Sequence, residues 1–589
     1  MTNTKTIKIA LAQTHVQVGI DESTINHNVN QLVDCYKSGN EQGCDLVIGP
    51  ELSLTGYSLC DLMNRNDVQS LVSSAEVDLI EQVEIIKSAN DTGLIFGNYS
   101  SFGDYKLVTD KILLSDYESL SGKVVDESLL LNYVTIVGLS ESIPISRVVK
   151  KYLPNESVFD ETRWFGRAIE SSEPILVNGI RVGICICHDI WIEDTTRDLV
   201  NKGAQIIVVS NASPFVHGKE ADRHSTIGGF AKKYNIPIVY VNMVSACDEV
   251  VFDGGSFSVD KNGDIITQLK YFEADMAISE IEIDPSDPPI IPSGKIALTA
   301  STEHLHCFDA GNAYEACVYG LNQFINAISN NSGHVVIGLS GGIDSALVAT
   351  MAVDALGAAR VHGVLIPSKF TSDDSNIFAE KFAKNIGISY ETLSIEKMYI
   401  AASDTFGLDN LESIVSENVQ SRMRGLTLMM YSNSRGWLPL ATGNKSELAV
   451  GYCTLYGDTV GAYAPIKDLY KTEVFKVSNY RNSVDEYNLA NPIPNEIIDR
   501  EPTAELRPNQ KDTDSLPSYE TLDTILVSYI EHTKSIEEII AMGHNEVNVN
   551  RIVKLIKNSE FKRKQSPVGT RLTHYNFGLG RRIPISAKW

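Results

Sequence analysis

Three residues in the first third of the chain could together break an amide bond. Glu51 ends the run DLVIGPE, Lys150 lies in KKYLPNESVFDE, and Cys187 ends the apolar run VGICIC. A thiol at the carboxyl end of a buried strand can point into the mouth between strand and helix, where α/β enzymes commonly place a nucleophile. The carboxylate could accept the thiol proton, and the ammonium group could offset the charge that develops on the carbonyl oxygen. Each residue alone is more often a packed cysteine or a surface charge, so the hypothesis depends on all three.

A second set of residues has the pattern of a phosphate-binding turn. The segment HVVIGLSGGIDSALVA predicts an apolar strand, a Ser/Gly-rich turn and a helix. This order points backbone N–H groups and a helix N-terminus at an anion. The turn lacks the GxxxxGK(S/T) pattern, so phosphoryl transfer by a P-loop is not indicated. We therefore expect an anion-binding site at six consecutive residues, Ser340, Gly341, Gly342, Ile343, Asp344 and Ser345.

The elements that would position both sets alternate along the chain. From Ile7 to about residue 280, short β-branched runs are separated by longer amphipathic stretches, which is typical of strands buried between helices. Four prolines in IDPSDPPIIP then exclude a regular helix and indicate a linker. A second α/β series follows, and the polar segment from about Pro492 favours an ordered loop or lid over a third core. We predict domains at 1–280 and 304–589, joined by a linker at 281–303.

Charge and hydropathy restrict the classes of partner. The formal net charge of -25 repels polyanions, so we expect no nucleic-acid partner. We expect the one basic cluster, Lys562, Arg563 and Lys564, to be a solvated surface turn, with contact to an anionic small molecule as the alternative. The chain starts without the apolar stretch of a signal peptide, and no apolar run approaches the ~18 residues that cross a bilayer. We therefore expect a cytoplasmic protein with no membrane partner.

The cysteines favour a reactive thiol over a structural framework. There are nine of them, an odd number, and they show no paired CxxC spacing. A disulfide framework or a zinc site is therefore not expected. The closest pair, Cys185 and Cys187, should face the same side of one strand, because side chains alternate along a strand with a period of two.

The sequence segments around the first set of residues resemble the motifs of a known family. The phrases PELSLTGY, KKYLPNESVFDE and CHDIW, in this order, resemble the Glu-Lys-Cys triad of the nitrilase superfamily, especially of its glutaminase members. The resemblance implies an α-β-β-α sandwich in which Glu51 is the general base, Lys150 the oxyanion-stabilising cation and Cys187 the nucleophile. Lys151 is the alternative to Lys150, disfavoured because two residues separate the family lysine from the Leu-Pro pair.

The same resemblance implies a glutamine pocket. Glu161 matches the position that receives the α-ammonium group of the substrate, and Tyr57 and Ser213 match others that line the pocket; packing or helix capping is the alternative for all three. One residue departs from the pattern. The family glutaminases usually carry Cys-Glu-Asp where this chain has Cys187-His188-Asp189, which leaves the role of His188 open.

The second half of the chain resembles a broad family and, within it, a narrower one. Its turn resembles the pyrophosphate-binding loop of ATP pyrophosphatases, which implies a doubly wound parallel α/β domain of the adenine nucleotide α-hydrolase type. Further segments, among them LATGNKSELAVGYCTLYGD and EPTAELRPNQ, resemble glutamine-dependent NAD synthetases. This resemblance implies that Asp344 and Glu447 bind magnesium. It implies that Thr442, Lys471 and Thr503 contact ATP. It also implies that Arg422, Arg424 and Asp458 contact the deamido dinucleotide. The two arginines can both face one ligand only where the helix ends or bends, because residues i and i+2 lie on different faces.

Taken together, the resemblances imply a homo-oligomeric ligase that uses glutamine, ATP and nicotinic acid adenine dinucleotide, with Mg²⁺, to make NAD. Another amidotransferase with the pyrophosphatase loop is an alternative, disfavoured by the nitrilase-type first half. A tRNA-modifying enzyme is disfavoured by the acidic charge. A catalytically silent sensor of nucleotide or glutamine is a further alternative, and it should have lost some of the catalytic residues.

Overall fold

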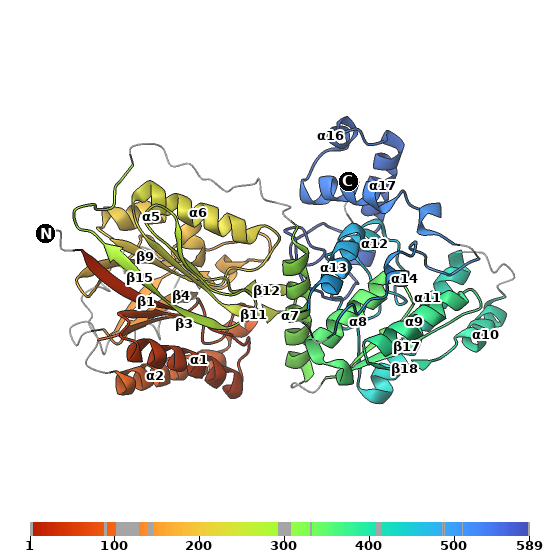
Figure 1. Ribbon diagram of the computed structural model, residues 1–589, viewed down its shortest axis with the longest axis horizontal. Helices are drawn as coiled ribbons and strands as arrows, with labels where there is room; N and C mark the ends of the chain where they lie inside the picture. Colours follow the sequence, from red (N-terminus) through yellow and green to blue (C-terminus); the bar gives the residue numbers. More distant parts are fainter. Residues whose placement is uncertain are drawn as a thin grey trace. The chain divides into compact units, whose positions relative to one another are not determined.

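The computed structural model of the chain describes residues 4–87, 91–101, 129–139, 145–292, 308–329, 333–407, 414–485, 487, 489–508 and 510–586. The chain divides into two compact units, Met1–Cys247 with Val251–His304, and Asp248–Val250 with Leu305–Trp589 (Figure 1). The last strand of the first unit, β15 (Asp275–Ile283), continues three residues past position 280, where we expected the first domain to end. Residues 293–303 of the predicted linker lie outside the described residues. None of the helices in the described ranges is long and apolar enough to cross a membrane.

The first sheet of the first unit has the order β15-β1-β2-β3-β4-β5, with β6 paired to β4. Strands β1, β2 and β3 are parallel, and β15, β4 and β5 run antiparallel to their neighbours. Helices α1 and α2 cover its outer face (Figure 1). The bounds of these elements, besides β15, are β1 Lys5–Gln13, α1 Glu22–Glu41, β2 Leu46–Ile48, η1 Cys60–Asn64, α2 Asn66–Ile86, β3 Gly93–Ser101, β4 Leu130–Val137, β5 Ile145–Val149, η2 Glu161–Arg163 and β6 Phe165–Gly166.

The second sheet has the order β14-β13-β10-β9-β8-β7, and its three central strands, β8, β9 and β10, are parallel. Apolar side chains of both sheets, such as Ile48 and Val208, share one core, while the opposite face of the second sheet packs on α5 and α6. The layers are therefore α-β-β-α, as predicted. The bounds are β7 Ile175–Val177, β8 Ile180–Ile186, η3 Cys187–Trp191, α5 Glu193–Asn201, β9 Ile206–Asn211, α6 Lys219–Tyr234, β10 Ile238–Asn242, β11 Val244–Cys247, β12 Val250–Asp253, β13 Phe257–Val259 and β14 Ile265–Gln268.

The second unit is built on a four-stranded parallel sheet of order β18-β17-β16-β19. The order places β16, the first strand of this sheet, between the second and the fourth, so the chain changes direction beside β16. Leu428 of α11 packs on Val336 and Val364 on one face, and α8 contacts the same two strands. The doubly wound parallel fold is thus confirmed. The bounds are α7 Ala310–Ser329, β16 Val335–Gly338, α8 Ile343–Leu356, η4 Ala358–Arg360, β17 Val361–Leu365, α9 Asp373–Asn385, β18 Ser389–Thr392, α10 Glu396–Phe406, α11 Ile414–Arg435 and β19 Leu438–Pro439.

A helical layer completes the second unit and has an apolar core of its own, which includes Leu522 and Ile552. The polar segment from Pro492 adds only short helices, as expected of an ordered loop. The bounds are α12 Lys445–Val450, α13 Lys471–Ser483, α14 Asn495–Ile498, η5 Asp512–Asp514, α15 Tyr519–Leu526, η6 Val527–Glu531, α16 Ile536–Ala541, α17 Glu546–Asn558 and α18 Glu560–Arg563.

The basic cluster at 562–564 is a solvated turn only at Lys564, which is exposed, and the expectation was wrong for the other two residues. Arg563 is buried and donates to the carbonyls of Leu448 and Ala449, and Lys562 donates to those of Gly451 and Cys453. The last carbonyls of a helix lack intrahelical partners, so cations there satisfy them and complement the helix dipole. These two side chains therefore hold the C-terminal end of α12.

Candidate active sites

The nucleophile candidate lies at a sharp turn. Cys187 follows β8, begins the short helix η3 and has a φ of 45°, in the left-handed region. It is 4% exposed and joins the core between the two sheets, whereas Cys185 packs on the side of α5 and α6. The two cysteines therefore do not face the same side, because the strand ends at Ile186 and the left-handed residue reverses the alternation. All eight cysteines within the described ranges are free thiols.

Glu51, Lys150 and Glu161 form a buried charged group in the first unit. Lys150 Nζ lies 2.7 Å from Glu51 Oε1 and 2.8 Å from Glu161 Oε1, and all three side chains are fully buried. Tyr57 donates its hydroxyl to Glu161 Oε1 at 2.9 Å. Burying one cation and two carboxylates in an apolar interior costs desolvation free energy. A group of this kind is therefore a candidate for a functional role. The structure thus brings four of the predicted residues into direct contact.

Ala212, at the end of β9, connects Cys187 to this group. Its N–H donates to Glu51 Oε2 at 3.1 Å, and its carbonyl accepts from Cys187 Sγ at 3.7 Å. Ser213, which we expected in the glutamine pocket, follows directly, and its hydroxyl accepts from Arg223 at 3.2 Å. The base and the thiol are therefore held by the two backbone polar groups of one residue, Ala212.

Asn132 of β4 is a contact that the sequence did not indicate. Its amide donates to Glu51 Oε1 at 2.7 Å, so both oxygens of Glu51 are held in place. No motif surrounds it, and it reaches Glu51 only because β4 lies in the same sheet as β3, next to the segment that carries Glu51.

The electrostatics fit a proton transfer within the group. Burial raises the pKa of the Cys187 thiol, and the neighbouring carboxylate Glu51 raises it further, while Lys150 opposes both. Burial alone would lower the pKa of Lys150, but Glu161 and Glu51 raise it above its ordinary value, so this ammonium stays charged. Burial also raises the pKa of Glu161. The thiol is therefore neutral at rest, and its ionisation needs a base within reach.

Lys151 points away from this group. Its ammonium lies 3.5 Å from Asp194 and 3.8 Å from Asp198, both on α5. The geometry therefore favours Lys150 over Lys151 as the cation beside Glu51.

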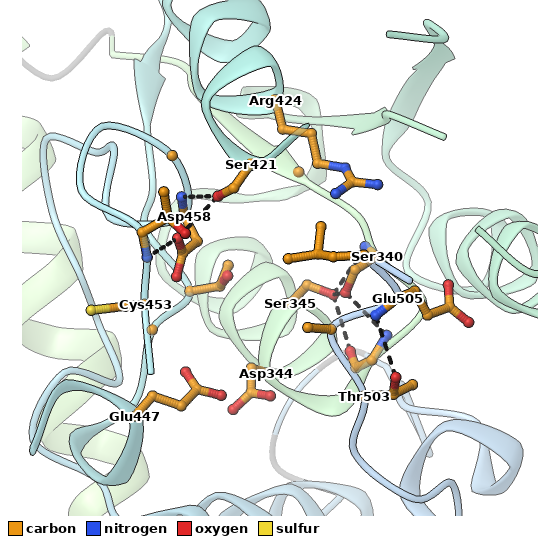
Figure 2. A pocket seen from close by; sticks show the side chains of 18 of the residues that line it. Ser340, Asp344, Ser345, Ser421, Arg424, Glu447, Cys453, Asp458, Thr503 and Glu505 are labelled. Atoms are coloured by element: carbon orange, nitrogen blue, oxygen red, sulfur yellow. Dashed lines mark hydrogen bonds between the residues drawn. The ribbon is translucent and has the colours of Figure 1, made fainter. Parts of the chain in front are cut away.

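The second unit holds a cavity of about 480 Å³ at the point where the strand order reverses. In doubly wound folds ligands bind in this crevice, outside the carboxyl ends of the strands. Figure 2 shows Ser340, from the loop after β16, and Glu447, from α12, among the side chains that line it. Eleven predicted residues line it: Ser340, Gly342, Ile343, Asp344, Ser345, Arg424, Thr442, Glu447, Asp458, Lys471 and Thr503.

The turn after β16 is preorganised at the N-terminus of α8. Ser345 Oγ lies 3.1 Å from Ser340 Oγ and accepts from the Ser340 N–H at 3.3 Å, while the Gly342 N–H donates to Ser340 Oγ at 3.2 Å. Gly341 has a φ of 75°, and a Cβ there would meet the Ser375 carbonyl oxygen at 2.5 Å. Only glycine fits this position, which itself does not line the cavity.

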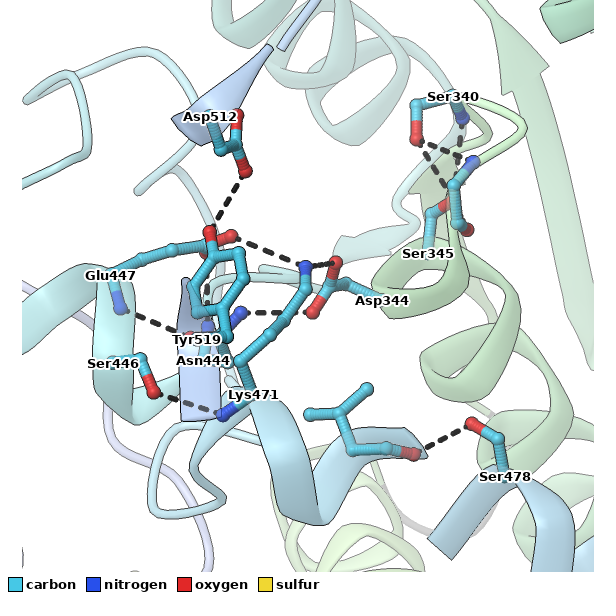
Figure 3. Close-up of polar contacts among 12 residues, drawn as sticks. Ser340, Asp344, Ser345, Asn444, Ser446, Glu447, Lys471, Ser478, Asp512 and Tyr519 are labelled. Atoms are coloured by element: carbon cyan, nitrogen blue, oxygen red, sulfur yellow. Dashed lines mark hydrogen bonds and ion pairs between the residues drawn. The ribbon is translucent and has the colours of Figure 1, made fainter. Parts of the chain in front are cut away.

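Two carboxylates and a lysine form the polar wall of the cavity (Figure 3). Lys471 Nζ forms an ion pair with Asp344 and lies 3.6 Å from Glu447 Oε1. Asn444 donates to Asp344 Oδ1 at 2.9 Å, and its N–H donates to Glu447 Oε2 at 3.3 Å as part of the cap of α12. Burial raises the pKa of Glu447, which the Lys471 cation opposes.

This donor set fits a magnesium ion. No group of three or more His, Cys, Asp or Glu side chains in the described residues could hold a metal by itself. Mg²⁺ is commonly bound through one or two hard carboxylates together with substrate phosphates and water. Asp344 and Glu447 supply two such carboxylates beside the phosphate-binding turn.

The two arginines of α11 have different environments. Arg424 lines the cavity, where its guanidinium donates to the Ile366 carbonyl at 3.1 Å, and burial lowers its pKa to about 10. Arg422 does not reach the cavity and donates instead to the Leu455 carbonyl at 3.2 Å. Because α11 is one continuous helix through both positions, the two side chains take different faces. The geometry therefore supports Arg424 and gives no support to Arg422.

Asp458 lines the cavity (Figure 2), and desolvation there raises the pKa of its carboxyl group. It accepts from the Thr454 N–H at 2.6 Å and from the Ser421 hydroxyl at 3.1 Å. Thr503 lies on the segment after α14, where its hydroxyl donates to the Gln510 carbonyl at 2.5 Å. The sequence missed Asn444, and it missed Asp512, a buried carboxylate on this cavity that accepts from the Tyr519 hydroxyl at 2.8 Å.

Each of the two units matches a known protein family. Residues 8–287 match the carbon-nitrogen hydrolase family, and residues 314–566 match the NAD synthase family. A "Glutamine-dependent NAD(+) synthetase" of Rhodobacter capsulatus is 36% identical over 100% of this chain and 99% of its own length. The chain belongs to the glutamine-dependent NAD(+) synthetase family. The predicted family, and with it the prediction of a ligase that uses glutamine as amide donor, is confirmed.

Further proteins are similar to this chain along nearly its full length. A protein of the same name from Acinetobacter baylyi is 34% identical over 99% of both chains. The solved glutamine-dependent NAD+ synthetase of Acinetobacter baumannii, in complex with adenosine diphosphate, has a TM-score of 0.69 at 32% identity and covers 99% of this chain and 98% of its own. A synthetase structure from Cytophaga hutchinsonii, 19% identical with a TM-score of 0.74, shares the fold.

Proposed function

We propose that this chain makes NAD from nicotinic acid adenine dinucleotide, ATP and glutamine, with one active site in each unit. The observation that carries the proposal is that the buried Glu51–Lys150 pair stands beside Cys187 in the unit that matches carbon-nitrogen hydrolases. In the NAD synthase unit, the turn at 340–345 opens onto a cavity that carries two carboxylates. A silent sensor would not need to keep both sets intact.

The first unit releases ammonia from glutamine. Glu51 takes the proton of the Cys187 thiol as the sulfur attacks the carboxamide carbon, and Lys150 offsets the charge on the carbonyl oxygen. Ammonia leaves with that proton, and a thioester remains. Water, deprotonated by Glu51, then attacks the thioester and frees glutamate. Glu161, whose buried Oε2 accepts no hydrogen bond from the residues that the structure describes, would receive the α-ammonium group of the substrate, and Tyr57 and Ser213 would line the same pocket.

The second unit activates a carboxylate. The nicotinate carboxylate oxygen attacks the α-phosphorus of ATP, and pyrophosphate leaves toward the turn at 340–345, Thr442 and Thr503. Ammonia then attacks the adenylated carboxyl carbon and loses a proton, the bond from that carbon to the bridging oxygen breaks, and AMP leaves with the bridging oxygen. Arg424 and Asp458 face the dinucleotide, and the two carboxylates, Asp344 and Glu447, would hold Mg²⁺. When bound, this ion neutralises charge on the leaving pyrophosphate.

Three further features remain predictions: the homo-oligomer, the cytoplasmic location and a protected path for ammonia. The path is expected because free ammonia would be protonated and lost in bulk water. The support for the first two is the sequence alone.

Incubation with competing acceptors tests the proposed reaction. The protein is given ATP, magnesium and glutamine with either nicotinic acid adenine dinucleotide, xanthosine monophosphate or aspartate, and the products are identified by mass. NAD, AMP, pyrophosphate and glutamate should form with the first acceptor only. A product that has gained nitrogen from glutamine with either of the other two, an amine from xanthosine monophosphate or an amide from aspartate, would show that the chain is a different amidotransferase.

His188 should be dispensable for glutamine cleavage. Burial lowers its pKa to about 4, and the nearby cations Lys150 and Lys219 lower it as well, so the imidazole stays neutral at working pH. The substitution His188→Gln should therefore keep glutamine turnover within about tenfold, well below the ~10²–10⁴ of a lost general acid or base. Glutamate release by the purified variant is the measurement. A loss of 10³-fold with an unchanged melting temperature would give the imidazole a catalytic role.

A further inference from the structure

Asp189 ties together two chain segments that belong to different sheets. Its carboxylate is buried and accepts from the backbone N–H groups of Tyr152 at 2.7 Å, Lys151 at 3.1 Å and Ile186 at 3.2 Å. Ile186 ends β8 in the second sheet, and residues 150–152 follow β5 at the edge of the first sheet. Asp189 itself lies two residues after Cys187, in η3. One side chain thus joins the segment of the catalytic lysine to the turn of the nucleophile.

Without this link, the backbone contacts among the described residues hold Lys150 from its own side of the sandwich, and its remaining tie to the second sheet runs through its ammonium and Glu51. Its N–H donates to the Asn132 carbonyl of β4, and its carbonyl accepts from the Ala168 N–H, which follows β6. Both contacts belong to the first sheet. Glu51 has its own tie to the second sheet, because its N–H donates to the Asn211 carbonyl and its carboxylate accepts from Ala212.

The side chain of Lys151 does not replace the tie. It extends to Asp194 and Asp198 of α5 and is partly exposed, and exposed pairs of this kind contribute at most ~1 kcal/mol. The backbone of residues 151 and 152, by contrast, is fixed by hydrogen bonds to a buried carboxylate, which are roughly twice as strong as neutral ones.

We propose that Asp189 is a positioning residue of the glutaminase site: its carboxylate fixes the Lys150 ammonium relative to Cys187 Sγ across the two sheets. This inference rests on the proposed function, since it assigns a task only if Lys150 and Cys187 act together. A displacement of about 1 Å in such a pair can cost about 10²-fold in rate.

A carboxylate suits this place better than an amide. Three N–H groups converge on it, and an ionised carboxylate only accepts hydrogen bonds, whereas an amide would turn one NH₂ group toward a donor. Burial raises the pKa of Asp189 to about 6, which the hydrogen bonds from Tyr152, Ile186 and Lys151 oppose. The charged form is therefore available at neutral pH for all three donors.

The variant Asp189→Asn tests the proposal, with Asp194→Asn as the matched control. Asp194 contacts the same lysine and tyrosine as Asp189, but through their side chains. We expect Asp189→Asn to lower kcat for glutamate release about 10²-fold and to change KM for glutamine less than about threefold. Asp194→Asn should stay within twofold of the wild type for both.

A second readout separates positioning from folding. The charged groups that face the Cys187 thiol are Glu51, Lys150 and Glu161, and Lys150 is the one that stabilises a thiolate. If Asp189→Asn lets Lys150 move away, the pH profile of Cys187 alkylation by iodoacetamide should shift to higher pH. A purely structural residue would change the melting temperature but leave this profile unchanged. Asp189→Glu, which keeps the charge, should restore the wild-type profile at least in part.

The outcomes are distinct. Wild-type kcat and an unshifted alkylation profile in a folded Asp189→Asn protein would overturn the inference. Loss of activity together with loss of folding in both Asp189 variants would overturn it too, because Asp189 would then stabilise the unit and not position Lys150. If the wild-type protein itself released no glutamate from glutamine, the proposed function would fail instead.

Discussion

Replacement of Cys187 by alanine should abolish NAD synthesis from glutamine and leave synthesis from ammonium intact. The variant deletes the sulfur beside Ala212 and Glu51, and the second unit keeps every residue of its cavity. We expect the glutamine-dependent rate to fall by at least about 10⁴-fold, as for other deleted nucleophiles. Ammonium salt at moderately alkaline pH should restore NAD formation, because free ammonia can attack the adenylate without a thioester step. Both rates are measured as NAD formed by the purified variant.

Cys185 provides the matched control for this variant. It is the neighbouring buried thiol, but it packs on the side of α5 and α6. Cys185→Ala should keep glutamine-dependent synthesis within about threefold of the wild type. Glutamine use at near wild-type rate by Cys187→Ala would place the nucleophile elsewhere. Failure of ammonium to rescue a well-folded variant would contradict the independence of the second site.

The variants Asp344→Asn and Glu447→Gln should abolish NAD formation with either nitrogen source. Each keeps the shape of the side chain and removes one of the two charges paired with Lys471. The proposed magnesium ion would lose a hard ligand, and the charge on pyrophosphate would no longer be balanced. We expect a loss of at least about 10³-fold, or about 4 kcal/mol of transition-state stabilisation. The measurement is NAD formation with glutamine and, separately, with ammonium.

Two controls show whether this loss of NAD formation is specific to the second active site. Glutamate release by the first unit should persist in both variants. Glu380→Gln removes an exposed ion pair with Lys384 on α9 and should change no rate by more than about twofold. Full NAD synthesis by either variant at ordinary magnesium concentration would remove the metal assignment.

The sequence predicted the parts of each site that lie next to a strand end. Glu51, Lys150 and Cys187 follow strands of two sheets, and the resemblance of the segments around them, in chain order, to the nitrilase triad led us to expect them together. The structure then favoured Lys150 over Lys151, because only one of two adjacent side chains can turn toward Glu51. Asn132 could not be found in this way. It sits in the middle of the run LLNYVTIV, 81 residues from Glu51, and carries no local signal.

The wrong expectations came from local geometry that the sequence does not fix. Cys187 departs from strand alternation because its backbone is left-handed at a non-glycine residue. Lys562 and Arg563 were expected in solvent, but a long cationic side chain can bury its stem and donate to carbonyls at the end of a helix. For the pair Arg422 and Arg424, the spacing alone showed that a continuous helix could turn only one toward the ligand, although not which one.

The most direct test of the two-site account follows the nitrogen atom. The protein is incubated with ATP, magnesium, nicotinic acid adenine dinucleotide and glutamine labelled with ¹⁵N in its amide group, and NAD is analysed by mass spectrometry. NAD should carry the label in its carboxamide, one mass unit above the unlabelled product, and Cys187→Ala should make labelled NAD from ¹⁵N-ammonium but not from labelled glutamine. Unlabelled NAD from the wild type, or labelled NAD from Cys187→Ala supplied only with labelled glutamine, would contradict the account.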